Sequence, residues 1–215
     1  MVFKEFMKVW RKDNLLQQAI DDMHRMLDLA ERMYNAAMQE AFYQGGSDID
    51  IKATDQAINR FERKIRKKVL EHLTINPKQD VTSSLCLTSI IIDIERIGDH
   101  CKNIIETAEL KNDESVERYQ KVIADFDQAT KKAFGLTMAA LKNGDAKLAK
   151  QVMENHGKMK RAVTKMIRDI VKDDISVKAS TYYILLAKEV KKVHAHLSIV
   201  CSSVANPFPR IGFKS

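Results

Sequence analysis

One apolar pattern occurs twice in this chain of 215 residues, and it constrains the fold more than any other feature. Small or apolar residues follow one another at alternating spacings of four and three, as in a helix that buries one face. The same spacing returns 96 residues later. The first set is Ile90, Ile94, Ile97, Cys101, Ile104 and Ala108, and the second is Leu186, Val190, Val193, Leu197, Val200 and Val204. We therefore predict an internal duplication of a helical unit.

The residues that end helices agree with this duplication. Only three prolines and seven glycines interrupt a chain that is 45% hydrophobic and rich in helix-forming residues. They predict six helices, of about 14–44, 54–73, 77–110, 116–143, 145–175 and 176–205. We predict an all-α fold of two tandem antiparallel three-helix bundles. The predicted parts are an N-terminal segment (1–12), a first bundle (13–110), a second bundle (113–205) and a C-terminal tail (206–215).

Local signals predict where single helices begin. Asn76 is the expected N-cap of the third helix, with Pro77 at its first position and Gln79 returning a hydrogen bond. Gly144 and Asp145 are expected to start the fifth helix, and Ser176 the sixth.

The two halves of the chain differ in charge. Residues 1–110 hold 16 Lys or Arg and 18 Asp or Glu, whereas residues 111–215 hold 20 and 11. The formal net charge of +7 therefore lies in the second half. Basic side chains gather on the fifth helix, where an acidic partner surface would bind them. The residues we expect there are Lys158, Lys160, Arg161 and Lys165.

The cysteines and the apolar segments indicate the cellular setting. Cys86, Cys101 and Cys201 lie far apart in apolar helical runs, so we expect buried free thiols in a reducing compartment. No window approaches the roughly 20 apolar residues that span a bilayer. We expect a cytoplasmic protein that can lie at the inner face of the membrane. Residues 1–12 are amphipathic; we expect them to pack on the first bundle, with membrane contact as the alternative.

Acidic residues border the apolar face of the third helix. Glu95 and Asp99 are four residues apart and share one side, with Gly98 between them and the core, where a neighbouring helix can approach closely. Asp55 and Glu62 border the second helix in the same way. Clustered carboxylates repel one another, and their oxygens suit hard or borderline metal ions. The alternative is a solvated acidic face paired with nearby arginines: Arg63, Arg66 or Arg96.

Three stretches resemble the PhoU family of phosphate-uptake regulators. They are "ERIGDHCKNIIETAE", "DQAINRFERKIRKKVLEHL" and "INPKQDVTSSLCLTSIIIDIERIGDH". The resemblance covers most of residues 13–110 and rests only on architecture in 113–205. It implies tandem three-helix bundles and metal clusters, commonly iron or zinc, on an E/D-x-x-x-D motif. That motif falls on Glu95 and Asp99, and Asp55 and Glu62 match further acidic positions, with Asn59 in place of the acid between them.

The second half lacks the same motif. Ninety-six residues after Glu95 and Asp99 stand Lys191 and Ala195, so we expect metal in the first bundle only. Glu189, His194 and His196 stand nearby, and His156 lies in the fifth helix, so a remodelled histidine site in the second bundle is the alternative. It is the less favoured one, because His194 and His196 are two residues apart and cannot share a helical face.

The resemblance implies a cytoplasmic regulator that contacts a phosphate transporter or its sensor kinase, and not an enzyme. A di-iron enzyme would carry Glu-x-x-His pairs, and the sequence contains none. The alternative function is a metal-free helical scaffold, or a nucleic-acid binder that uses the basic second bundle, although no nucleic-acid motif is found. Assembly with further copies of the chain stays open.

Overall fold

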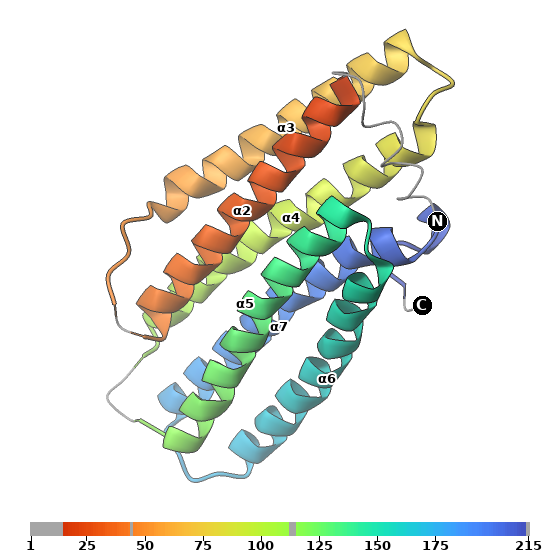
Figure 1. The fold of residues 1–215 in the computed structure, drawn as a ribbon. Helices are drawn as coiled ribbons and strands as arrows, with labels where there is room; N and C mark the ends of the chain where they lie inside the picture. Colours follow the sequence, from red (N-terminus) through yellow and green to blue (C-terminus); the bar gives the residue numbers. More distant parts are fainter. Residues whose placement is uncertain (1–14, 44, 112–114, 214–215) are drawn as a thin grey trace.

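The computed structural model describes residues 15–43, 45–111 and 115–213, and all structural statements below refer to them. This part of the chain forms six α-helices and one short 3-10 helix (Figure 1). The helices are α2 (Leu15–Ala41), α3 (Ile51–Ile75), α4 (Val81–Ala108), α5 (Glu117–Asn143), α6 (Ala146–Val171), α7 (Val177–Ala205) and η1 (Phe208–Arg210).

The helices form two bundles that lie side by side. Helices α2, α3 and α4 pack on one another, as do α5, α6 and α7. The bundles meet mainly where α4 packs along α7, with a smaller contact between α2 and α5 (Figure 1). The predicted all-α fold of two tandem bundles is confirmed.

The two apolar stripes of the sequence form the core at this junction. On α4 every predicted stripe residue is buried except Ala108, which is half-buried. On α7 all six are buried. Each fully buried branched side chain stabilises the fold by about 1.5–3 kcal/mol through removal of apolar surface from water. This burial explains why both stripes are apolar throughout.

The predicted helix starts at Asp145 and Ser176 are confirmed. Asp145 Oδ1 accepts from the backbone N–H groups of Lys147 at 2.8 Å and Leu148 at 3.2 Å. Ser176 Oγ accepts from the N–H of Ala179 at 3.1 Å. The residue before Asp145 is Gly144, whose φ of 61° is in the left-handed region that favours glycine.

The predicted start of the third helix is wrong. Asn76 ends α3 instead, because its N–H donates to the carbonyl of His72 at 2.8 Å. Gln79 then donates its own N–H to Asn76 O at 3.0 Å within a turn, so it returns no capping-box bond. Helix α4 begins only at Val81, after Asp80 with a left-handed φ of 55° and no side-chain capping bond. Pro77 therefore lies in the connection and not in the helix.

Cys86, Cys101 and Cys201 are buried free thiols, as expected. Burial raises the pKa of Cys86 to about 11, so its thiol stays protonated and unreactive at neutral pH. Among the described helices, none is long and apolar enough to cross a membrane. The predictions for residues 1–12 fall outside the described residues.

The N-cap of α6 gives a direct test of helix capping in this fold. Replacing Asp145 by Ala removes two hydrogen bonds to the first turn and should lower the free energy of unfolding by about 1 kcal/mol. Urea unfolding followed by circular dichroism measures this loss. The exposed Asp174, between α6 and α7, is the matched control, and Asp174→Ala should change stability by about 0.5 kcal/mol or less. Equal losses in both variants would contradict the capping role.

Candidate functional site

Helices α3 and α4 bring the predicted acidic residues to one face of the first bundle. Gly98 of α4 faces α3, and a Cβ atom there would lie 3.4 Å from Ile58 Cδ1 and 3.5 Å from Asp55 Oδ1. These are ordinary contact distances, so a methyl group would fit there in van der Waals contact with α3. The small residue thus places Asp55 beside the part of α4 that carries Glu95 and Asp99. We call Glu95, Asp99, Asp55 and Glu62 the acidic face.

Lys102 links α3 and α4 across the acidic face. Lys102 Nζ lies 3.1 Å from Asp55 Oδ1 and 2.8 Å from Asp99 Oδ1. Asn59 Nδ2 donates a long hydrogen bond of 3.4 Å to the other oxygen of Asp55. Glu62 pairs with Arg66 at 2.7 Å, which is one of the arginine pairings considered from the sequence. The sequence reasoning missed Lys102, although its spacing of three from Asp99 was a signal.

The electrostatics of Glu95 show that the four carboxylates act on one another. Burial raises the pKa of Glu95 above its usual value, and Asp99, Glu62 and Asp55 raise it further. Lys102 opposes this shift. The negative charges of the acidic face therefore act more strongly on Glu95 than the positive charge of Lys102 does.

The acidic face has the chemistry of a cation site, but its side chains are not arranged around one point. In residues 15–43, 45–111 and 115–213, no group of three or more His, Cys, Asp or Glu side chains is placed to hold a metal ion. Asp55 and Asp99 each use an oxygen on the Lys102 ammonium, which lies between them. Carboxylate oxygens are suitable ligands for a metal ion, and the Lys102 ammonium lies where a bound cation would lie. The metal site stays a prediction.

The equivalent face of the second bundle is basic. Lys191 stands 96 residues after Glu95. Burial lowers the pKa of Lys191, and the positive charges of Lys188, Lys160 and Lys192 lower it further. The repulsion by Lys160 shows that α6 and α7 share one basic cluster. The predicted docking residues Lys158, Lys160, Arg161 and Lys165 are all exposed on α6. The structure therefore brings Lys160 together with lysines of α7 that the sequence reasoning did not name.

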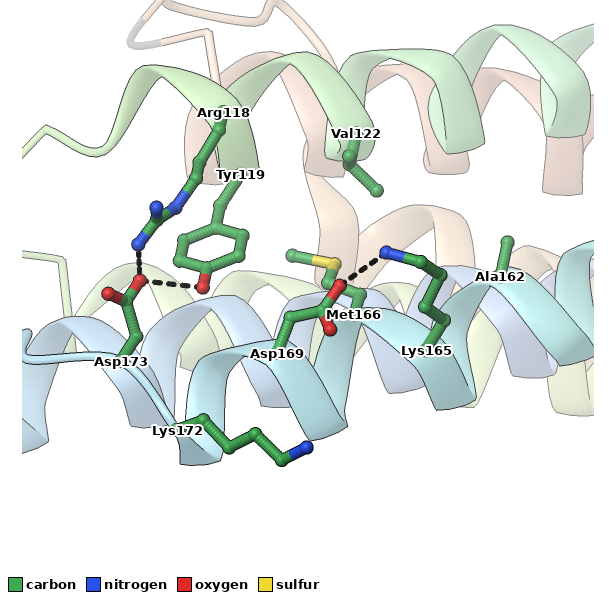
Figure 2. A pocket seen from close by; sticks show the side chains of 9 residues that line it. All are labelled: Arg118, Tyr119, Val122, Ala162, Lys165, Met166, Asp169, Lys172 and Asp173. Atoms are coloured by element: carbon green, nitrogen blue, oxygen red, sulfur yellow. Dashed lines mark hydrogen bonds and ion pairs between the residues drawn. The ribbon is translucent and has the colours of Figure 1, made fainter.

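A surface pocket of about 530 Å³ lies between α5 and α6. Its charged groups are largely paired with one another (Figure 2). Arg118 and Tyr119 both point to Asp173, and the Tyr119 hydroxyl donates to its Oδ2 at 2.7 Å. Lys165 lies 2.6 Å from Asp169 on the same helix. Lys165 therefore already has an acidic neighbour, and of the predicted docking residues it is the least available to a partner.

The histidines of α7 point to different neighbours, as their spacing predicted. His194 is fully buried, and its ring centroid lies 5.6 Å from that of His156 on α6. His196 instead reaches Asp93 of α4, with Nδ1 2.8 Å from Oδ1. The two rings therefore do not form one site.

Comparisons with known proteins give a consistent result for the first bundle and for the whole fold. Residues 23–108 match the sequence model of the PhoU domain. Two relatives from strains of Xylella fastidiosa are each 22% identical over 198 residues, covering 89% of this chain and 82% and 84% of their own. Both are named phosphate-specific transport system accessory protein PhoU homolog.

Solved structures share the fold at low sequence identity. The crystal structure of PhoU from Pseudomonas aeruginosa has a TM-score of 0.76 and 19% identity, covering 88% of this chain and 95% of that one. The phosphate transport system regulatory protein PhoU from Streptococcus pneumoniae has a TM-score of 0.71 and 17% identity, covering 88% and 91%. The similarity therefore extends through both bundles.

The raised pKa of Glu95 predicts a pH-dependent stability difference. A carboxyl group whose pKa is higher in the folded chain than in the unfolded one favours folding when protonated and costs stability when ionised. Glu95→Gln should therefore raise the midpoint of thermal unfolding at neutral pH, and the gain should vanish as the pH falls below the usual value of 4.5. Calorimetry in the presence of a chelator measures both trends.

The matched control is Glu106→Gln on the exposed side of the same helix. It should leave the unfolding midpoint nearly unchanged across the same pH range. A Glu95→Gln variant that is less stable than the parent at neutral pH would contradict the repulsion among the four carboxylates.

Proposed function

We propose that this chain, whose residues 23–108 match the PhoU domain, is a regulator of inorganic phosphate transport that works as an adaptor and not as an enzyme. It acts at the cytoplasmic side of the membrane by contact with a phosphate transporter or its sensor kinase. The names of the two Xylella relatives, accessory proteins of a phosphate-specific transport system, support this role.

The observation that carries the proposal is the opposite charge of two equivalent faces. Burial and then acidic neighbours raise the pKa of Glu95, whereas burial and then basic neighbours lower the pKa of Lys191, which stands at the same place in the second repeat. Both faces lie on packed helices, so each presents its charge in a fixed position. The basic face binds an acidic surface of the partner, and the acidic face remains available for a cation.

The acidic face is the proposed metal site. Glu95, Asp99, Asp55 and Glu62 would hold iron or zinc, whose charge would neutralise the repulsion at Glu95. Carboxylate donors and the raised pKa of Glu95 support this site. Lys102 bridges Asp55 and Asp99, so binding a metal there requires its ammonium to move away.

Charge reversal tests the docking proposal. Changing Lys158, Lys160, Arg161 and Lys165 to Glu should abolish capture of the phosphate transporter from solubilised membranes, because the basic face then repels an acidic surface. The control reverses four exposed basic residues of α3, which are Lys52, Arg60, Arg63 and Lys67. It changes the net charge equally and should retain capture. Circular dichroism checks that both variants are folded.

The same variants separate docking from nucleic-acid binding. Capture that survives the α6 reversal would overturn the docking proposal. A gel shift of duplex DNA or of RNA that weakens steeply with salt and is lost only in the α6 variant would favour the nucleic-acid function instead.

Metal content tests the acidic face. Elemental mass spectrometry of the purified protein should find stoichiometric iron or zinc that is lost in the variant Glu95→Ala, Asp99→Ala. The exposed pair Glu106→Ala, Glu109→Ala, at the C-terminal end of α4, is the control and should keep the metal. Equal metal content in all three proteins, or none after reconstitution, would leave a regulator that works by docking alone.

A further inference from the structure

A second cluster of polar side chains lies where α4 packs on α7. Asp93 and His100 come from α4, and Glu189 and His196 come from α7. The two histidines are 96 residues apart, and so are the two carboxylates, so the cluster repeats the internal duplication. It uses neither Glu95 nor Asp99.

Each histidine is held by the carboxylate of the opposite helix. His100 Nδ1 lies 2.8 Å from Glu189 Oε2, and His196 Nδ1 lies 2.8 Å from Asp93 Oδ1. The remaining ring nitrogens face each other, with His100 Nε2 3.3 Å from His196 Nε2. All four side chains are mostly buried, with side-chain exposures of 9–15%.

The carboxylates decide where the histidine protons lie. Glu189 also accepts from Lys192 Nζ at 2.6 Å and from Asn103 Nδ2 at 3.1 Å, so three donors meet at its two oxygens and His100 donates to it from Nδ1. Asp93 accepts from His196 Nδ1 in the same way. With Nδ1 as the donor of each ring, both Nε2 atoms present lone pairs to each other, which favours a cation between them.

The spacing of the rings fits a metal ion better than a shared proton. Two nitrogens on one tetrahedral zinc ion, each about 2.05 Å from the metal, are roughly 3.35 Å apart, and their ring centroids are roughly 5.2 Å apart. The observed separations are 3.3 Å for the nitrogens and 5.2 Å for the centroids. An N–H hydrogen bond is usually shorter, at about 2.9–3.0 Å to oxygen.

Each ring of the pair is oriented by a carboxylate. Glu189 is held in turn by the Lys192 ammonium, 2.6 Å from its Oε1. A carboxylate that accepts from the far nitrogen of a histidine is the usual outer partner of a metal-binding imidazole, because it fixes the ring and raises its basicity. Both halves of the cluster have this arrangement.

We propose that His100 and His196 bind one zinc ion through their Nε2 atoms. Asp93 and Glu189 orient the two rings, and water completes the coordination, since the pair supplies only two protein ligands. The ion connects α4 to α7 and hence the first bundle to the second. This site is independent of the acidic face and of the proposed transport role.

The test is a zinc titration of the full chain after removal of bound metal and of any affinity tag. Isothermal calorimetry of the parent should show a zinc site that is lost in His100→Gln and in His196→Gln. The same site should persist in Glu95→Ala, Asp99→Ala, which removes the acidic face, and in His156→Gln, which removes a histidine outside the pair. Cobalt in place of zinc should give the absorption of a tetrahedral complex in the parent and in these two controls, and not in the variants of His100 or His196.

Two further variants keep the test decisive if a histidine variant fails to fold by circular dichroism. Asp93→Asn and Glu189→Gln preserve side-chain shape and should weaken zinc binding about 10–100-fold, because they remove the outer partners. Unchanged zinc affinity in these variants, or a titration that is the same in the parent and in His100→Gln, would overturn the proposal. The two rings would then share a proton.

Discussion

The packing of α4 along α7 is the contact on which the other features of this protein depend. It joins two stripes of apolar side chains that repeat after 96 residues, and almost all of them are buried. The two helices place the histidine pair between them, α4 also carries Glu95 and Asp99 of the acidic face, and α7 carries the lysines that lie near Lys160. A slip of one helical turn, about 5.4 Å, would separate His100 from Glu189 and His196 from Asp93 at once.

Apolar packing alone does not fix such a register, because it is not directional. Hydrogen bonds between the bundles supply the direction. Tyr182 of α7 donates to the carbonyl of Ala41, the last residue of α2, at 2.8 Å. Near the same end of α2, the Tyr43 hydroxyl donates to Asp127 of α5 at 2.8 Å. Polar contacts at the end of α2 thus complement the apolar junction of α4 and α7.

The sequence predicted features that depend on spacing within one helix, such as the stripes, the caps at Asp145 and Ser176, and the common face of Glu95 and Asp99. It failed at Asn76, because a single N–H bond to His72 assigns that residue to the preceding helix. The pairing of His100 with Glu189 was beyond reach, since it depends on the register between helices 89 residues apart. Lys102 could be predicted only in part. Its pairing with Asp99 follows from a spacing of three residues within one helix, whereas its pairing with Asp55 depends on how α3 packs on α4.

The bond from Tyr182 to Ala41 also has a consequence for the order of folding during synthesis. The two residues are 141 positions apart, so the last carbonyls of α2 leave the ribosome long before their partner exists. Until then only water and Lys111, whose Nζ lies 3.4 Å from the Ala41 carbonyl, can bind there, and the end of α2 lacks its bond to α7. The nascent first bundle is therefore incomplete at one end, and the arrival of α7 finishes both bundles together.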